Sequence, residues 1–136
     1  MKLLFHTAIL FFMTATVLPQ NRDADINRIF ANIEEGLPAG SIDRFSNYFA
    51  EKTFISLFNG KSGYFSANQA YYVLKDFFSI YRPISFKIDN LVIDTTNPFA
   101  SGALRTSYRG IRKSAMVFIS LQKYGDEWRI SQITIN

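Results

Sequence analysis

The hydrophobic pattern at the start of the chain's polar part is helical. Four apolar residues recur at spacings of three and four positions, which places them on one face of an α-helix: Ile26, Ile29, Phe30 and Ile33. Asp23 or Asp25 is expected to cap the start of this helix, and Gly36 and Pro38 are expected to end it.

The next part of the chain changes from helix to strand. Ile42, Phe45 and Phe49 share one face of a second, shorter predicted helix. Residues 53–58, Thr-Phe-Ile-Ser-Leu-Phe, combine β-branched and aromatic side chains and predict a strand. Residues 59–63, Asn-Gly-Lys-Ser-Gly, predict a turn, because Asn and Gly tolerate the left-handed backbone that many turns require.

A third helix is predicted in the aromatic stretch FSANQAYYVLKDFF, residues 65–78. Ser66 can cap it, while Gln69 can reach back to the backbone of residue 66, and together they form a capping box. The apolar stripe of this helix comprises Ala70, Leu74, Phe77, Phe78 and Tyr81. Pro83 ends the helix, because the residue before a proline avoids the α conformation. We interpret the rings of this stretch mainly as core.

The second half of the chain has the two-residue period of β-strands. Ile84, Phe86 and Ile88 alternate with polar residues. The remaining predicted elements are a turn at 95–98, strands at 99–109 and 115–123, a turn at 124–127 and a strand at 128–135. Helices first and an antiparallel meander last predict an α+β fold with the helices on one side of the sheet.

The last predicted strand changes phase. Trp128 and Ile130 fall on one face, whereas Ile133 and Ile135 fall on the other. A β-bulge, or burial on both faces of a bent sheet, would explain this change.

Residues 1–20 have the layout of an export signal. A positive start at Lys2 precedes a mostly apolar stretch, residues 3–18, after which the chain turns polar. The cleavage position stays open. An uncleaved membrane anchor is the alternative, but the apolar stretch is short for a span that needs about 20 residues. We therefore expect a periplasmic or secreted protein with one domain, residues 21–136.

The residue types that are missing exclude several kinds of chemistry. The chain contains no cysteine, and its one histidine, His6, lies within the predicted signal. A mature chain without either would have no Ser-His-Asp or Cys-His catalysis, no thiol redox chemistry, no disulfide and none of the usual zinc sites. The formal net charge of +4 comes without a long basic run or a nucleic-acid motif. We expect neither a nucleic-acid partner nor a cofactor or metal.

Several motifs resemble a known family. They are Tyr48-Phe49, the block Phe65-Ser66-x-x-Gln69-Ala70-x-x-Val73-Leu74-x-Asp76-Phe77-Phe78, Gly102-x-Leu104-x-Thr106, and the ending Trp128-x-Ile130-x-x-Ile133-x-Ile135. Over residues 23–136 the chain resembles small exported bacterial proteins labelled a domain of unknown function, in the nuclear transport factor 2-like superfamily. The resemblance implies a cone, in which a bent antiparallel sheet wraps around helices and often dimerises through its open face. It implies no activity.

Three residues are candidates for contacts with a ligand or partner. Tyr72 lies at the edge of the aromatic stripe, where its hydroxyl could reach the mouth of a pocket. Arg105 and Arg109 share the parity of one strand and could clamp a carboxylate or a phosphate. Arg112 and Lys113 extend this basic group, and no acidic residue is near it in the sequence. A solvated sheet face is the alternative explanation.

We expect an exported, non-catalytic binding or interaction domain of unknown ligand. An apolar pocket between helices and sheet would hold an apolar or anionic ligand, or the sheet face would bind a partner protein or form a homodimer. The alternative is a small acid–base enzyme, isomerase-like, that uses an Asp and a Tyr on an apolar substrate. Asp76, Asp89 and Asp94 are its candidate carboxylates, although each is more simply a solvated or capping residue. A filled cone with an exposed apolar sheet face would favour the interaction domain.

Overall fold

The computed structural model describes residues 21–136 as one α+β domain. Its elements are α1 (Arg22–Gly36), the 3₁₀ turns η1 (Ile42–Arg44) and η2 (Ser46–Tyr48), β1 (Phe49–Leu57), β2 (Ser62–Phe65), α2 (Ala67–Ile80), β3 (Arg82–Val92), β4 (Phe99–Tyr108), β5 (Ile111–Tyr124) and β6 (Glu127–Ile135). The predicted export signal, residues 1–20, lies outside the described residues. Among the described helices, none is long and apolar enough to cross a membrane.

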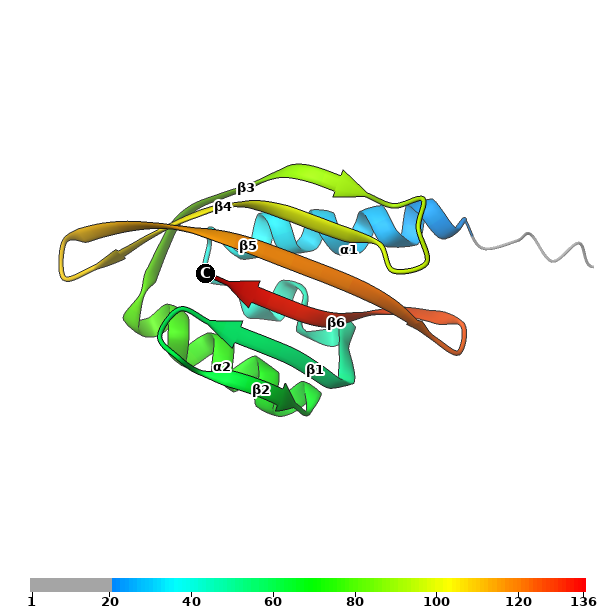
Figure 1. Ribbon diagram of the computed structural model, residues 1–136, viewed down its shortest axis with the longest axis horizontal. Coiled ribbons are helices and arrows are strands. Elements are labelled where there is room, and N and C mark those ends of the chain that lie inside the picture. The colour runs from blue at the N-terminus through cyan, green and yellow to red at the C-terminus, as the bar shows by residue number, and fades with distance from the viewer. Residues whose placement is uncertain (1–20) are drawn as a thin grey trace, which may run out of the picture.

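The domain has two layers. Six strands form one sheet in the order β2-β1-β6-β5-β4-β3, and both helices lie against the same face of it (Figure 1). The predicted α+β arrangement is therefore confirmed. One detail differs from an all-antiparallel sheet, because β6 pairs with β1 in parallel. The pattern within each strand could not show this pairing, which joins the first and last strands of the chain.

Helix α1 confirms the predicted apolar face but not the predicted cap. Ile26, Ile29, Phe30 and Ile33 are all buried. The cap is Asn21, whose side chain accepts a hydrogen bond from the Ala24 backbone N–H at 3.4 Å. Asp23 and Asp25 lie instead in the first turn, where negative side chains complement the helix dipole.

The segment between α1 and α2 holds more strand than predicted. Ile42, Phe45 and Phe49 are buried as a group, but two 3₁₀ turns replace the expected helix and Phe49 already begins β1. The strand β2 was not predicted, because its four residues, Ser-Gly-Tyr-Phe, are too few to show a period.

Helix α2 begins with the predicted capping box. The Ser66 hydroxyl accepts from the Gln69 backbone N–H at 3.2 Å, and the Gln69 side chain accepts from the Ser66 N–H at 3.0 Å. Ala70, Leu74 and Phe77 are buried with Phe78 against the sheet.

A bulge in β6 explains the phase change in the last strand. Ser120 pairs with Gln132 and Leu121 pairs with Ile130, so Ser131 is an extra residue between two pairs. The bulge turns Ile130, Ile133 and Ile135 to the same side, where all are buried. This prediction is confirmed.

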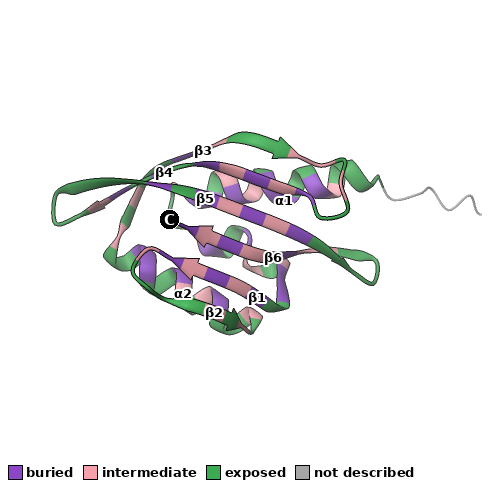
Figure 2. Cartoon of the chain, viewed as in Figure 1, coloured by how far each residue is buried: buried purple, intermediate pink, exposed green. Residues whose placement is uncertain are grey.

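The interior of the cone is filled with side chains. One apolar cluster joins the buried faces of α1 and α2 to those of the strands (Figure 2). Phe77 lies 5.1 Å from Phe78 and 4.9 Å from Phe58, measured between ring centroids, and Leu74 is fully buried beside them. These side chains occupy the space between α2 and the sheet in which an apolar ligand was expected.

Candidate interaction surface

The three candidate residues do not form one site. Tyr72 is 53% exposed on α2, with its ring 5.1 Å from that of Tyr71. It borders a shallow hollow near the start of α2, which is lined by Ser46, Asn47, Ala67, Asn68 and Tyr71 but by neither arginine. Arg105 and Arg109 belong to β4 and to the turn that follows it.

Arg105 and Arg109 do not share a strand face, so this expectation was wrong. Strand β4 ends at Tyr108, which pairs with Ile111 across a two-residue turn. Arg109 and Gly110 make that turn with φ angles of 49° and 78°. Left-handed backbone at both central positions is typical of the tight turn that matches the twist of a hairpin.

The face of the sheet opposite the helices carries aromatic and small polar side chains. We call this surface the outer face; it comprises Phe54, Ser56, Tyr64, Phe99, Ser101, Ala103, Met116, Phe118, Ser120, Gln132 and Thr134. These positions alternate with buried ones. On β5, for example, Met116 and Phe118 point outward while Val117 and Ile119 are buried.

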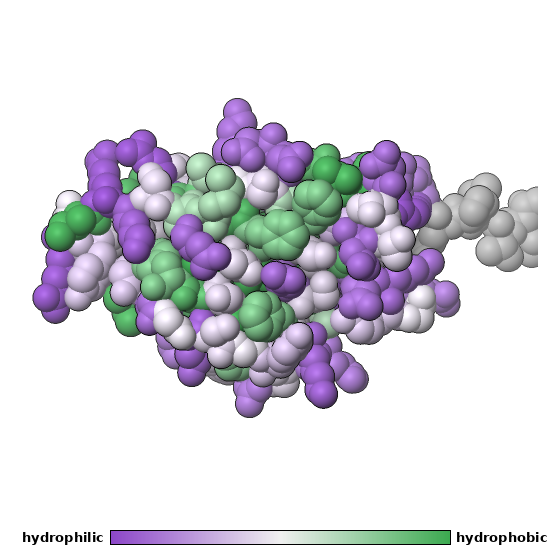
Figure 3. All heavy atoms as spheres, viewed as in Figure 1, coloured by the Kyte–Doolittle hydropathy of each residue, from purple (hydrophilic) through white to green (hydrophobic). Residues whose placement is uncertain are grey.

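Large apolar side chains lie exposed on the outer face. Tyr64 is 72% and Met116 is 51% exposed. Two aromatic pairs cross between strands, Phe54 with Tyr64 at 5.2 Å and Phe99 with Phe118 at 5.6 Å between ring centroids. Figure 3 shows apolar and near-neutral residues across the middle of this face, with the hydrophilic ones mostly around its edge.

A second hollow lies at the end of the domain where α1 starts. Asp25 and Arg28 form an ion pair across 2.7 Å on one side of it. On the other side Arg129 pairs with Glu127 and donates a hydrogen bond to the backbone oxygen of Asn47 at 2.9 Å. Sequence reasoning missed this hollow, because its residues come from three separate segments. Most of its charges are already neutralised by one another.

The candidate carboxylates of an acid–base enzyme are exposed. Asp76, Asp89 and Asp94 all lie at the surface. Asp89 borders a hollow between α1 and β3 with Glu34, whose carboxylate accepts a hydrogen bond from the Ile88 N–H at 2.7 Å. Within residues 21–136, no group of three or more His, Cys, Asp or Glu side chains is placed to hold a metal ion.

A curved sheet that holds helices on one face and leaves the other open is characteristic of the nuclear transport factor 2-like fold. Solved structures agree on this fold. A nuclear transport factor 2-like protein of unknown function from Shewanella oneidensis superposes with a TM-score of 0.59 at 15% identity, covering 83% of this chain and 97% of that one.

The chain belongs to the family described as Domain of unknown function (DUF4783), whose model matches residues 30–136. A family member from Bacteroides uniformis is similar, with a TM-score of 0.69 and 21% identity over 78% of this chain and 94% of that one. Another, from Bacteroides ovatus, has a TM-score of 0.67 and 22% identity over 77% and 91%. No curated protein matches the chain.

Proposed function

We propose that this protein is an exported, non-catalytic interaction domain that forms a homodimer through the outer face of its sheet. The observation that supports this most is the combination of a filled interior with an exposed apolar sheet face. A filled interior leaves no room for a ligand beside α2, whereas large exposed apolar patches mark surfaces that bind other molecules.

The size of the outer face suits a stable dimer. Six strands about 4.8 Å apart, each taken as roughly eight residues long at about 3.3 Å per residue, give a face of about 750 Å². Stable protein interfaces bury about 800 Å² on each partner.

The charge pattern favours a second copy of this chain as the partner. The middle of the outer face, for example Phe118 and Thr134, carries no charge, while Lys52, Lys87 and Arg105 lie toward its edges. A basic protein can bring two such neutral surfaces together without forcing like charges into contact.

The alternative of an acid–base enzyme has less support. It requires a shielded carboxyl group beside a tyrosine hydroxyl. Asp76, Asp89 and Asp94 face solvent, and neither Asp89 nor its hollow has a tyrosine beside it.

Sedimentation equilibrium of matched variants tests the dimer. Met116 on the outer face and Tyr72 on α2 are equally exposed, at 51% and 53%. Met116→Glu places two uncompensated charges in the proposed interface, so we expect dimer affinity to fall by about 100-fold or more. Tyr72→Glu should leave the dimer intact. A monomeric wild-type chain, or equal effects of the two substitutions, would overturn the proposal.

A further inference from the structure

We propose that one end of this domain docks on the surface of an anionic lipid bilayer. We call it the basic end; it comprises Arg82 and Ile84 of β3, Arg105 and Tyr108 of β4, Arg109, Ile111 and Arg112 around the β4–β5 turn, and Ile80 of α2. The basic end adjoins the proposed dimer interface, with Arg105 at the border between them, and the inference does not depend on the dimer.

The arginines of the chain divide into two groups. Arg22, Arg28, Arg44 and Arg129 each form an ion pair with a carboxylate. Among residues 21–136, Arg82, Arg105, Arg109 and Arg112 have no carboxylate within 4.0 Å. Residues 1–20 contain no Asp or Glu that could neutralise them. All the arginines without a carboxylate partner therefore lie at one end of the domain.

The strand register brings these arginines together. Ser107 of β4 pairs with Arg82 on one side and with Arg112 on the other, so the three residues form one row. Arg105 lies in the neighbouring row between Ser85 and Ser114. Strand spacing places the backbones of Arg82 and Arg112 about 10 Å apart. Guanidinium groups and serine hydroxyls at this spacing suit the phosphate oxygens of neighbouring lipid headgroups.

Exposed apolar side chains lie among these arginines. Ile111 is 70% exposed, Ile80 50%, Ile84 44% and Tyr108 38%. Ile80, Arg82, Tyr108 and Arg109 also border one hollow beneath the hairpin, whose lining contains no acidic residue. A soluble anion would use the arginines but not the isoleucines, whereas a bilayer offers phosphates to the former and an apolar boundary to the latter.

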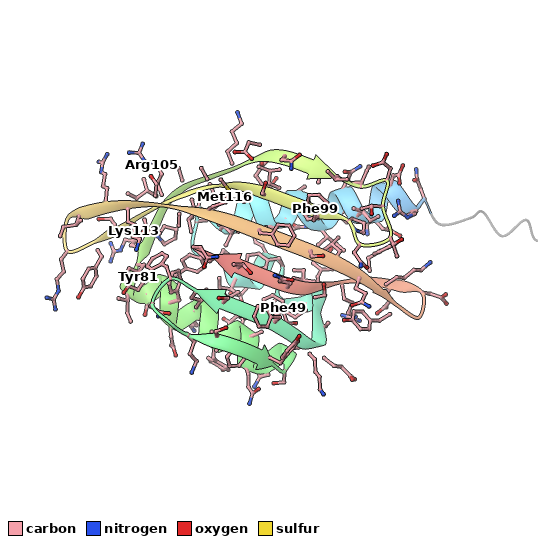
Figure 4. The ribbon with its side chains drawn as sticks, in the orientation of Figure 1. Phe49, Tyr81, Phe99, Arg105, Lys113 and Met116 are labelled. Atoms are coloured by element: carbon pink, nitrogen blue, oxygen red, sulfur yellow. The ribbon has the colours of Figure 1, made fainter. Side chains whose placement is uncertain are left out.

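The shape of the basic end fits contact with a flat surface. The β4–β5 hairpin reaches beyond the helices and forms one extreme of the domain, opposite the start of α1 (Figure 1). In Figure 4 Arg105 and Lys113 lie on the two strands of this hairpin, β4 and β5. Lys113 is engaged within the domain, because its amine lies 4.0 Å from the centroid of the Phe58 ring. Arg109 lies over the ring of Tyr108, with 5.2 Å between the guanidinium carbon and the ring centroid, but both residues belong to the basic end. The four arginines and Ile111 are thus the groups offered to a membrane.

The β4–β5 turn holds Arg109 in a backbone conformation that is unfavourable for arginine. Arg109 has a φ of 49°, a left-handed conformation that Asn, Asp and Gly adopt far more easily. Such a conformation costs stability, and residues held in this way cluster at functional sites. A role for the Arg109 side chain in binding accounts for its presence.

Vesicle binding with a site-specific probe tests the inference. Because the chain has no cysteine, Ile111→Cys and Asp126→Cys each accept one environment-sensitive dye, on opposite hairpins. The full chain is mixed with phosphatidylcholine vesicles, either pure or with about 30% phosphatidylglycerol, which gives the surface a negative potential. Pure phosphatidylcholine measures any contribution of residues 1–20. We expect the dye at position 111 to shift to the blue on anionic vesicles only, and the dye at position 126 to stay unchanged.

Matched charge variants test whether the arginines of the basic end bind the vesicles. At about 1 kcal/mol for each basic residue near an anionic surface, changing Arg82, Arg105 and Arg112 to Gln should weaken binding about 100-fold. Changing Lys52, Lys75 and Lys123 to Gln removes the same charge elsewhere on the domain and should change the affinity for anionic vesicles only a few-fold. Sedimentation of the arginine variant should give the same mass as wild type, which separates loss of docking from loss of the dimer.

Three results would overturn the inference. One is equal binding to neutral and anionic vesicles; another is an arginine variant that binds as tightly as wild type. The third is Ile111→Ser binding vesicles with unchanged affinity while inorganic polyphosphate binds the wild type in an arginine-dependent way. That result would assign the basic end to a soluble phosphate polymer.

Discussion

Replacing Gly102 by alanine tests how the sheet is bent around the helices. Gly102 lies on the buried side of β4, opposite Ile88 of β3, where the β3–β4 pairing shifts register between Ile88 and Asn90. A Cβ atom at this position would overlap the backbone oxygen of Lys87 and lie 2.9 Å from both the Lys87 carbonyl carbon and the Phe86 ring. Glycine is therefore what allows β3 to approach β4 this closely.

The size of the stability loss expected for Gly102→Ala follows from these contacts. Carbon atoms pack at about 3.5–4.0 Å, so β3 must retreat by at least about 0.6 Å from a Cβ at position 102. Overpacking of this kind typically costs about 1–3 kcal/mol, and the upper part of the range applies here because backbone atoms must move. Without the overlap, Gly102→Ala would raise the free energy of unfolding by about 0.5–1 kcal/mol, since glycine is unfavourable within a strand.

Urea denaturation measures the effect. We expect Gly102→Ala to lower the free energy of unfolding by about 2–3 kcal/mol. Ala103→Gly, on the outward side of the same strand, is the control and should cost only about 0.5–1 kcal/mol. A Gly102→Ala protein as stable as wild type, or more stable, would show that the close approach of β3 to β4 does not need glycine at this position.

Three further predictions concern single features. Ser66→Ala removes the capping box of α2 and should lower the free energy of unfolding by about 1 kcal/mol in urea titration; no change would show that the cap is dispensable. Arg109→Asn relieves the left-handed strain, so it should raise the free energy of unfolding by about 0.5–1 kcal/mol while weakening binding to anionic vesicles. A variant that is more stable and also binds the vesicles more tightly would contradict the proposed role of Arg109. Mass spectrometry of the protein isolated from cells should show a chain that begins between about residues 17 and 21, as the proposed export requires, whereas an intact Met1 in a membrane fraction would favour the uncleaved anchor.

Local patterns in the sequence predicted most of the helices and the α+β class. The period of α2 and its capping box depend on residues within two turns, and the bulge in β6 is visible as a change of phase from Ile130 to Ile133. Where sequence reasoning failed, distant or very short features decided the outcome. The parallel β1–β6 pairing joins segments about seventy residues apart, and the strand β2 is too short to show a period.

The surfaces were harder to predict than the fold. Phe99 and Phe118 look like core residues in sequence, and only the alternation along their paired strands shows that they point away from the helices. Arg82 is distant from Arg112 in the chain, and the β3–β4–β5 register is what places both beside Ser107. Tyr72 failed to join the arginines because it lies on the side of α2 that faces away from the buried stripe.

In the proposed homodimer, the outer face of the sheet joins two copies of this chain. Distance measurement between spin labels on single cysteines tests it most directly. Lys52→Cys places the label at the edge of the outer face, and Asp76→Cys places it on the solvent side of α2. Because a two-fold dimer brings the same surface of both copies together, the distance between labels should be shorter at position 52 than at position 76. A shorter distance at position 76, or no coupling at either position, would contradict a dimer formed through the outer face.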